Sequence, residues 1–162
     1  MKKIFLSLLL MASLLLSGCS ARMPDFSVKK DMEGTVIQGD IQFDISSDFS
    51  GTPTVTIKSR ENAYDIIYEF SEDSVALICG EIRCDYAFED LPRKNIPVTV
   101  YKVLTSLEDE KNFSWDYDKK AMEWNFEGKI SGMSIKGACD DSGKVLSFYI
   151  PEINTIYQTL TA

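Results

Sequence analysis

The sequence predicts a mainly β (α+β) domain: a single curved antiparallel sheet (half-barrel) of about ten strands packed on one helix. From Asp31 onward, short runs of alternating apolar and polar residues are separated by turn residues, which is typical of antiparallel strands. Residues 96–107 break this rhythm, because their apolar residues recur at spacings of three and four. The strands carry more apolar surface than one helix covers, so the sheet has to curl or be covered.

The N-terminus carries a secretory signal pattern. Two lysines precede an apolar run from Ile4 to Leu16, and Ser17-Gly18-Cys19 follows the run. A transmembrane helix is the alternative, but the run has about 13 residues and a membrane span needs ~20. A cysteine directly after a small-residue pair resembles the lipobox of bacterial lipoproteins. This resemblance implies cleavage before Cys19 and a diacylglyceryl thioether on its sulfur.

The signal pattern divides the chain and sets its location. We expect residues 1–18 to be the lipoprotein signal peptide, residues 19–30 a lipidated tether, and residues 31–162 the β half-barrel domain. The protein is then extracytoplasmic and anchored by its lipid to the cell membrane or, as the other option, to the outer membrane. Ser20 carries no signal that decides between the two membranes.

Composition limits the partners. Removal of 18 of the 162 residues leaves 144, which suffices for one domain with a proper core. The removed segment takes two lysines with it, so the net charge falls from −8 to −10. An acidic domain lacks the basic surface that binds nucleic acid, and anionic lipid head groups repel it. We therefore expect no nucleic-acid partner, anchoring by the lipid alone, and a monomer.

The residue types argue against an enzyme. The chain contains no histidine, which removes the Ser-His-Asp and Cys-His nucleophile systems and every histidine-containing metal site. No G-x-S-x-G, H-E-x-x-H, P-loop or G-x-G-x-x-G motif occurs. The chain has 25 carboxylates, but no pair among them is marked as an acid and a base. We expect no catalytic residue, no cofactor and no metal.

The first half of the domain predicts strands separated by glycine, proline or acidic turns. The expected strands are Met32–Ile45 (one or two strands with a bend), Thr54–Lys58, Asp65–Phe70, Val75–Cys79 and Ile82–Phe88. A two-residue turn at Gly80-Glu81 joins the last two. In that register, one apolar face is shared by Val75, Leu77, Cys79, Ile82, Cys84, Tyr86 and Phe88.

Three cysteines follow the lipidated one: Cys79, Cys84 and Cys139. With a two-residue turn, Cys79 faces Ile82 and Cys84 faces Leu77, so the two cysteines lie on a diagonal ~7–8 Å apart, beyond bridging range. We therefore favour free, buried thiols. A four-residue loop would instead place the two cysteines opposite each other and allow a disulfide.

The helix expected at residues 96–107 has a clear N-terminus. Asn95 is a suitable cap, and Pro97 fits the first turn. The apolar face consists of Ile96, Val100, Val103, Leu104 and Leu107. A strand is the alternative, because several of these residues are β-branched.

The second half predicts a hairpin and three further strands. A turn at Asp118-Lys119 would place Trp115 opposite Met122 and Phe113 opposite Trp124, with one aromatic face and one polar face. The aromatic face comprises Phe113, Trp115, Tyr117, Met122, Trp124 and Phe126. The later strands are Ile130–Ala138, Val145–Ile150 and Ile153–Leu160. The segment Asp140–Gly143 suits a turn better than a calcium loop, because two carboxylates are too few ligands.

The order of elements resembles the half-barrel envelope lipoproteins of the LolA/LppX/LprG type. The matching features are Gly34, Gly39–Phe43, Thr54–Ser59, the Gly80 hairpin, Leu91-Pro92 before the helix, and Trp124-Asn-Phe126 with Gly128. The resemblance implies a sheet closed by helical segments around a hydrophobic hollow that holds acyl chains or lipidated partners.

Two functions follow as expectations. In the first, the lipoprotein is non-enzymatic and its concave face binds an acyl chain or another hydrophobic ligand. The expected lining residues are Leu77, Cys84, Tyr86, Leu104, Trp115, Met122 and Trp124. In the second, the domain is a cell-surface structural or protein-interaction module with a filled core, no small-molecule ligand, and envelope proteins as partners. A continuous apolar hollow of at least ~300 Å³ would favour the first.

Overall fold

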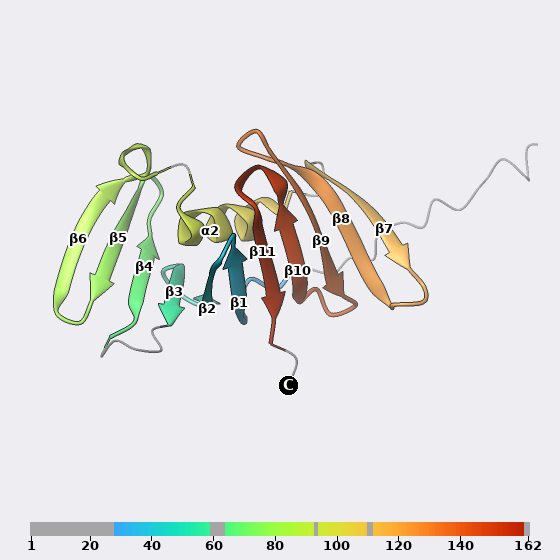
Figure 1. Cartoon of the computed structure of the whole chain (residues 1–162), viewed down its shortest axis with the longest axis horizontal. Coiled ribbons are helices and arrows are strands. Elements are labelled where there is room, and N and C mark those ends of the chain that lie inside the picture. Colours follow the sequence, from blue (N-terminus) through green and yellow to red (C-terminus); the bar gives the residue numbers. More distant parts are fainter. Residues whose placement is uncertain (1–27, 59–63, 93, 110–111, 161–162) are drawn as a thin grey trace, which may run out of the picture.

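A computed structural model describes residues 28–58, 64–92, 94–109 and 112–160. These residues form one open antiparallel sheet of eleven strands, with a helix against one face (Figure 1). The expected mainly β fold is thus confirmed, with one more strand than the sequence suggested. The signal peptide and Cys19 lie outside the described residues.

The strands follow the chain in a meander. Their bounds are β1 Met32–Gln38, β2 Ile41–Asp48, β3 Thr54–Lys58, β4 Ile66–Phe70, β5 Ser74–Cys79, β6 Ile82–Ala87, β7 Phe113–Asp118, β8 Glu123–Ile130, β9 Met133–Asp140, β10 Val145–Ile150 and β11 Thr155–Thr159. Two 3₁₀ turns, η1 (Phe88–Asp90) and η3 (Pro151–Ile153), and the helix α2 (Ile96–Ser106) complete the described elements.

The first strand pairs with the last. The order across the sheet is β6-β5-β4-β3-β2-β1-β11-β10-β9-β8-β7, so β1 and β11 lie side by side in the middle. Strands β6 and β7 are consecutive in the sequence and yet form the two opposite edges. The segment between them therefore has to cross the whole sheet, and α2 is the helical part of that crossing (Figure 1).

The sheet buries one continuous apolar face. Because side chains alternate along each strand, the pairing register places Val55 beside Tyr68, and Tyr157 beside Val36 and Phe148. All of these side chains are buried. This inner face carries the core, and α2 packs on its middle strands, chiefly against β3.

The helix forms as its sequence predicts. The Asn95 side chain accepts a hydrogen bond from the main-chain N–H of Val98 (3.1 Å), which caps the first turn. The expected apolar face is buried as a whole: Ile96, Val100, Val103, Leu104 and Leu107. The β-branched residues did not turn this segment into a strand, because tertiary packing of an amphipathic face outweighs a weak local propensity.

Aromatic rings cover glycines on the inner face. A Cβ atom built on Gly128 would lie 2.6 Å from the Phe113 ring, and one built on Gly137 would lie 2.3 Å from the Phe126 ring. The two glycines are the cross-strand partners of these two rings. The missing side chains let the rings lie close to the backbone, which allows the sheet to bend there.

The β7–β8 hairpin differs from the predicted register. Trp115 pairs with Phe126 rather than with Met122, because the loop has four residues instead of two. The Asp118 carboxylate accepts hydrogen bonds from the N–H groups of Lys120 (2.8 Å) and Ala121 (3.2 Å), which stabilises this longer turn. Met122 consequently lies in the turn with φ 59° and is 62% exposed, so its predicted place on the aromatic face is wrong.

Strand boundaries also shift after this hairpin. Ile130 ends β8 instead of beginning the next strand, since the turn falls at Ser131-Gly132. The expected strand Val145–Ile150 is confirmed.

The β5–β6 hairpin has the predicted register but not the predicted burial. Cys79 pairs with Ile82 and Leu77 pairs with Cys84, as expected for a two-residue turn, and both cysteines are free. Both thiols are exposed, because these strands extend beyond the part of the inner face that α2 covers. Cys139 is free and buried as expected, and this burial raises the pKa of its thiol to about 12.

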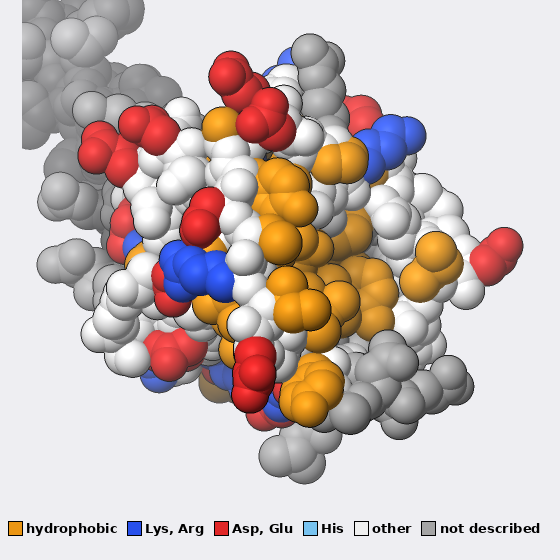
Figure 2. Space-filling view, turned by 90° about the vertical axis from the view of Figure 1, so that its left-hand side faces the viewer, with side chains coloured by type: hydrophobic (Ala, Val, Ile, Leu, Met, Phe, Trp, Pro, Cys, Tyr) orange, Lys and Arg blue, Asp and Glu red, His pale blue; other side chains and the backbone are white. Residues whose placement is uncertain are grey.

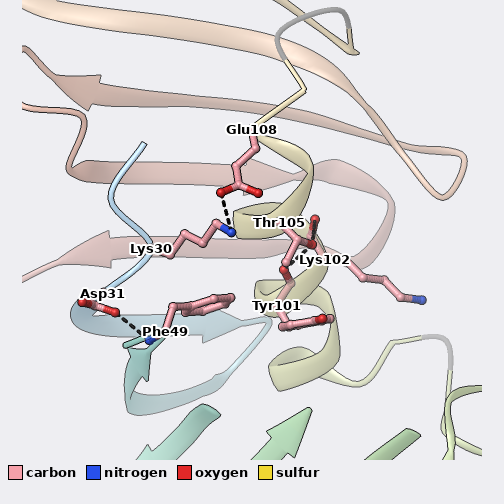
Figure 3. Close-up of polar contacts among 7 residues, drawn as sticks. All are labelled: Lys30, Asp31, Phe49, Tyr101, Lys102, Thr105 and Glu108. Carbon is pink, nitrogen blue, oxygen red and sulfur yellow. Dashed lines mark hydrogen bonds and ion pairs between the residues drawn. The ribbon is translucent and has the colours of Figure 1, made fainter. Parts of the chain in front are cut away.

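The described chain begins with a segment that is fixed to the domain, within the range expected as tether. Lys30 forms an ion pair with Glu108 just after α2 (2.6 Å), and its ammonium lies 5.2 Å from the centre of the Phe49 ring (Figure 3). The Asp31 carboxylate accepts a hydrogen bond from the N–H of Phe49, and the Phe49 ring stacks on Tyr101 of the helix. These contacts fix the C-terminal half of α2 against the segment just before β1 and the loop after β2.

Candidate functional site

The seven residues expected to line one hollow lie in separate places. Leu77, Cys84 and Tyr86 are together on β5 and β6, at one end of the inner face. Trp115 and Trp124 are on β7 and β8, at the other end. Leu104 lies on the buried face of α2, and Met122 lies in the β7–β8 turn.

The space between α2 and the middle of the sheet is filled by side chains. Leu104 has no exposed surface, and Val100 and Val103 beside it are also fully buried. They belong to one hydrophobic cluster with Ile45 and Val55 of the sheet. Leu104 is therefore a core residue in this structure rather than the wall of an open hollow.

A cleft opens at the N-terminal half of the helix. It has a volume of about 580 Å³ and lies between η1 and the start of α2 on one side and the β8–β9 turn on the other. We call it the helix cleft, and its lining residues are Phe88, Glu89, Leu91, Pro92, Val98, Thr99, Lys102, Ser131, Gly132 and Met133. None of the seven expected lining residues contributes to it.

Local sequence explains both walls of the helix cleft. Leu91-Pro92 ends the 3₁₀ turn, and the N–H of Asn95 then donates to the carbonyl of Pro92 (2.9 Å), which leads the chain into α2. Residues three and four positions apart lie on one side of a helix, so Val98 and Lys102 face the cleft together. On the far wall, Ser131 (φ 50°) and Gly132 (φ 82°) form the tight turn that ends the β8–β9 hairpin.

Among the described residues, the helix cleft combines apolar walls with one cation, Lys102, and one carboxylate, Glu89. Phe88, Leu91, Val98 and Met133 supply apolar surface, and Val98 is buried. The ammonium of Lys102 lies 5.9 Å from the centre of the Phe88 ring. Apolar walls with a few polar groups are typical of small-molecule sites, and the volume falls within their usual range of roughly 300–1,000 Å³. An elongated apolar molecule with an anionic end fits this chemistry.

A second depression of about 570 Å³ lies over β7 to β11 on the other face of the sheet and is more open to solvent. Its lining mixes apolar residues with polar ones, among them Asp116, Glu123, Asn125 and Glu127. The ion pair between Lys136 and Glu127 (2.9 Å) lies within it. This surface has the character of a hydrated outer face.

An apolar surface is exposed at the β6 end of the inner face. The register aligns Ile66 of β4, Cys79 of β5 and Ile82 of β6, with Cys84 and Tyr86 following along β6. Ile82 is 67% exposed and Tyr86 is 39% exposed. We call these five residues the β6 strip. Figure 2, which faces this end of the molecule, shows hydrophobic side chains gathered between charged flanks.

No group of three or more cysteines, aspartates and glutamates in the described ranges is placed to hold a metal ion. The Asp140 carboxylate accepts hydrogen bonds from the N–H groups of Ser142 (2.8 Å) and Lys144 (3.0 Å). Burial alone would raise the pKa of Asp140, but the hydrogen bonds from Ser142 and Lys144 lower it. This carboxylate therefore stabilises the β9–β10 turn.

The helices within the described ranges are all too short or too polar to cross a membrane. Comparison of the chain with protein-family models and with curated proteins finds no match.

Proposed function

We propose that this chain is an extracytoplasmic lipoprotein that binds an acyl chain, or another elongated apolar molecule with an anionic end, in the helix cleft. No catalysis is involved. The observation that carries this proposal is the helix cleft itself, whose volume exceeds the ~300 Å³ needed for a ligand. The anchor is the diacylglyceryl group on Cys19, supported by the lipobox-like pattern at Ser17-Gly18-Cys19.

The binding energy would come from desolvation. Each methylene that leaves water for an apolar wall contributes about 0.8 kcal/mol, so a few buried carbons suffice for micromolar binding. Lys102 is partly exposed at the cleft and can pair with a carboxylate or phosphate at the end of the ligand. Its attraction fixes which end of the ligand stays near solvent.

The tether would keep the helix cleft near the membrane. Nine positions separate Cys19 from Val28, the first described residue. An extended chain covers at most about 3.5 Å per residue, so Val28, where the described domain begins, stays within roughly 30 Å of Cys19.

The anchor is tested by expressing Cys19→Ala and fractionating the cells. The variant should no longer be processed at this position, and no mature lipidated form should appear in the membrane fraction. A variant that is still processed and still membrane-bound would overturn the anchor.

The ligand is tested by native mass spectrometry of the chain begun at Ser20 and purified without detergent. A co-purifying lipid, or binding of a fluorescent fatty acid at micromolar concentration, supports the proposal. Met133→Trp should fill the helix cleft and remove this binding. Met122→Trp is the matched control, because it adds the same ring in the exposed β7–β8 turn.

A clean apo mass together with no fatty-acid binding would rule out the ligand. The interaction module would then stand as the second candidate. It is favoured by a specific observation, the exposed β6 strip, since contiguous apolar surface on an edge strand is typical of contacts with another protein.

A further inference from the structure

We propose that two copies of this chain pair through strand β6, antiparallel and about a two-fold axis at Cys84. The contact extends the sheet from one copy into the other. It uses the free edge of β6 and does not require a ligand in the helix cleft, so it goes beyond the proposed function. It replaces our expectation of a monomer.

Strand β6 has no neighbour on its outer side among the described strands, so its main-chain groups are offered there in a defined pattern. In an antiparallel pair, residues alternate between those that hydrogen-bond to the neighbour and those that point away. The N–H of Phe88 donates to the carbonyl of Asp73 on the β5 side (3.3 Å). The main-chain N–H and C=O groups of alternate residues along a strand point to the same side. Ile82, Cys84 and Tyr86 therefore also form their main-chain hydrogen bonds with β5. Arg83 and Asp85 therefore direct their N–H and C=O groups to the open edge.

The charges on β6 match a second copy of the same strand. Arg83 and Asp85 lie on the outer face, one residue to either side of Cys84. In the register about Cys84, Arg83 of one copy lies opposite Asp85 of the second copy, and the reverse pair forms by symmetry. These are the residues whose main-chain groups face the edge, so hydrogen bonding and charge select the same register. Opposite charges on directly paired strands stabilise the pair.

The existing ion pairs are compatible with this exchange. The Arg83 guanidinium now contacts Glu69 (2.8 Å) and Asp85 (3.2 Å) of its own chain. The guanidinium can keep its ion pair with Glu69 and donate from its other nitrogens to Asp85 of the second copy, because it carries five N–H donors. All three side chains lie at the surface, so their rearrangement needs no repacking of the core.

The same register joins the apolar sides. Ile82 of one copy lies opposite Tyr86 of the second copy, and the two Cys84 residues face each other. Both inner faces lie on the same side of the extended sheet, so the β6 strip of each copy continues into that of the other. The exposed surface of Ile82 and Tyr86 would thereby be reduced.

The opposite edge lacks this complementarity. Strand β7 carries Asp116 and Asp118 on its outer face and no basic residue. Pairing of two β7 strands would bring carboxylates together, which is destabilising. Of the two edges of the sheet, only β6 is therefore suited to a second copy.

The contact is small, and the membrane would strengthen it. Pairing of one six-residue strand buries less than the ~1,000 Å² of a stable interface, so the dimer should be weak in dilute solution. Two copies anchored in the same membrane have a higher effective concentration, which favours a weak contact.

Disulfide trapping in intact cells tests the register. Opposed residues that do not hydrogen-bond to each other have Cα atoms ~4.5 Å apart, which allows a disulfide between the two Cys84 residues. Cells expressing the full chain are treated with copper phenanthroline; the two thiols give up two electrons to Cu(II) and release two protons to the solvent as the disulfide forms. Non-reducing electrophoresis should show a dimer. Cys84→Ser should abolish it, and Cys79→Ser is the matched control that should not.

Charge exchange tests the pairing itself. Arg83→Asp should reduce the trapped dimer at least fivefold, because the introduced carboxylate of each copy would face Asp85 of the other. Adding Asp85→Arg should restore the dimer, since the opposite charges return in swapped positions. The double variant still lacks the ion pair between residue 83 and Glu69 within each copy. If loss of that ion pair were the reason for the weaker dimer, the double variant would not restore the trapped dimer.

Three results would overturn the proposal. They are the absence of a trapped dimer in the wild type, a dimer that persists in Cys84→Ser, and a double charge variant no better than the single one. Ligand binding measured on the same variants should not change, because the helix cleft shares no residue with the β6 edge.

Discussion

Gly137 is a position where a single methyl group should clearly damage the fold. A Cβ atom there would lie 2.3 Å from Cζ of Phe126 and 2.4 Å from the main-chain oxygen of Ser147. Neither neighbour can move easily. The Ser147 oxygen belongs to the paired strand, and the Phe126 ring is 2% exposed and packs against Trp115 (centroid distance 5.3 Å).

The cost can be worked out from these contacts. Overpacking of a tight core costs up to ~3 kcal/mol. A glycine-to-alanine change recovers ~0.7 kcal/mol by restricting the unfolded chain. Gly137→Ala should therefore lower the free energy of unfolding by about 2 kcal/mol, or roughly 8 °C in melting temperature for a domain of this size.

Urea and thermal unfolding followed by circular dichroism measure this effect on the chain begun at Ser20. Gly51→Ala is the matched control, because no atom lies within 4 Å of a Cβ built there and its φ is not positive. It should change stability by less than about 1 kcal/mol, toward greater stability. Phe126→Leu combined with Gly137→Ala should cost less than the sum of the two, since the smaller side chain relieves the contact. A Gly137→Ala variant within about 0.5 kcal/mol of the wild type would refute the reasoning.

Three further substitutions are informative in the same assays. Trp124→Ala should cost ~3–5 kcal/mol, because the ring is 6% exposed; a loss below about 1 kcal/mol would mean that the ring is not core. Asn95→Ala should cost about 1 kcal/mol by removing the cap on α2, and an unchanged urea midpoint would contradict this. Asp140→Asn tests pH dependence. The folded pKa of Asp140 is lowered from its ordinary value of 3.8, so its contribution is complete above that pH and is lost as pH falls through the folded pKa. The difference in melting temperature between wild type and variant should therefore be full at about pH 6 and shrink as the pH falls below 3.8; a constant difference would contradict it.

Local signals in the sequence predicted the structure correctly where the interacting residues are only a few positions apart. Asn95 and Pro97 correctly predicted where α2 begins, because a cap is satisfied within one turn. Gly80 correctly predicted the two-residue turn and hence the pairing of Leu77 with Cys84. In both cases the partners are less than ten positions apart, so spacing determines geometry.

The pairing register of β7 and β8 could not be predicted from local signals. Alternation predicts which residues share a face, and it placed Trp115, Trp124 and Phe126 correctly. It does not distinguish a two-residue from a four-residue loop, since both preserve the alternation. The choice depends on Asp118, whose carboxylate binds two N–H groups of the longer turn.

The candidate site was missed for a topological reason. The helix cleft brings Phe88 and Lys102 together with Met133, which is more than thirty positions from either. That meeting depends on the crossing of α2 from one edge of the sheet to the other, which is a property of strand order. The pair Leu91-Pro92 before the helix was a usable signal for one wall, whereas nothing local identified Ser131-Gly132 as the other.

The same crossing accounts for the exposed β6 strip. Eleven residues of α-helix are about 16 Å long, whereas eleven strands at ~4.8 Å spacing span roughly 48 Å of sheet. One helix of that length can cover about a third of the inner face. At the β7 end, Trp115 and Trp124 with their aromatic neighbours fill much of what the helix leaves open. At the β6 end the corresponding side chains are smaller, with Tyr86 as the one large ring on β6. In the proposed pairing a second copy covers that end, and the order of Arg83, Cys84 and Asp85 sets its register.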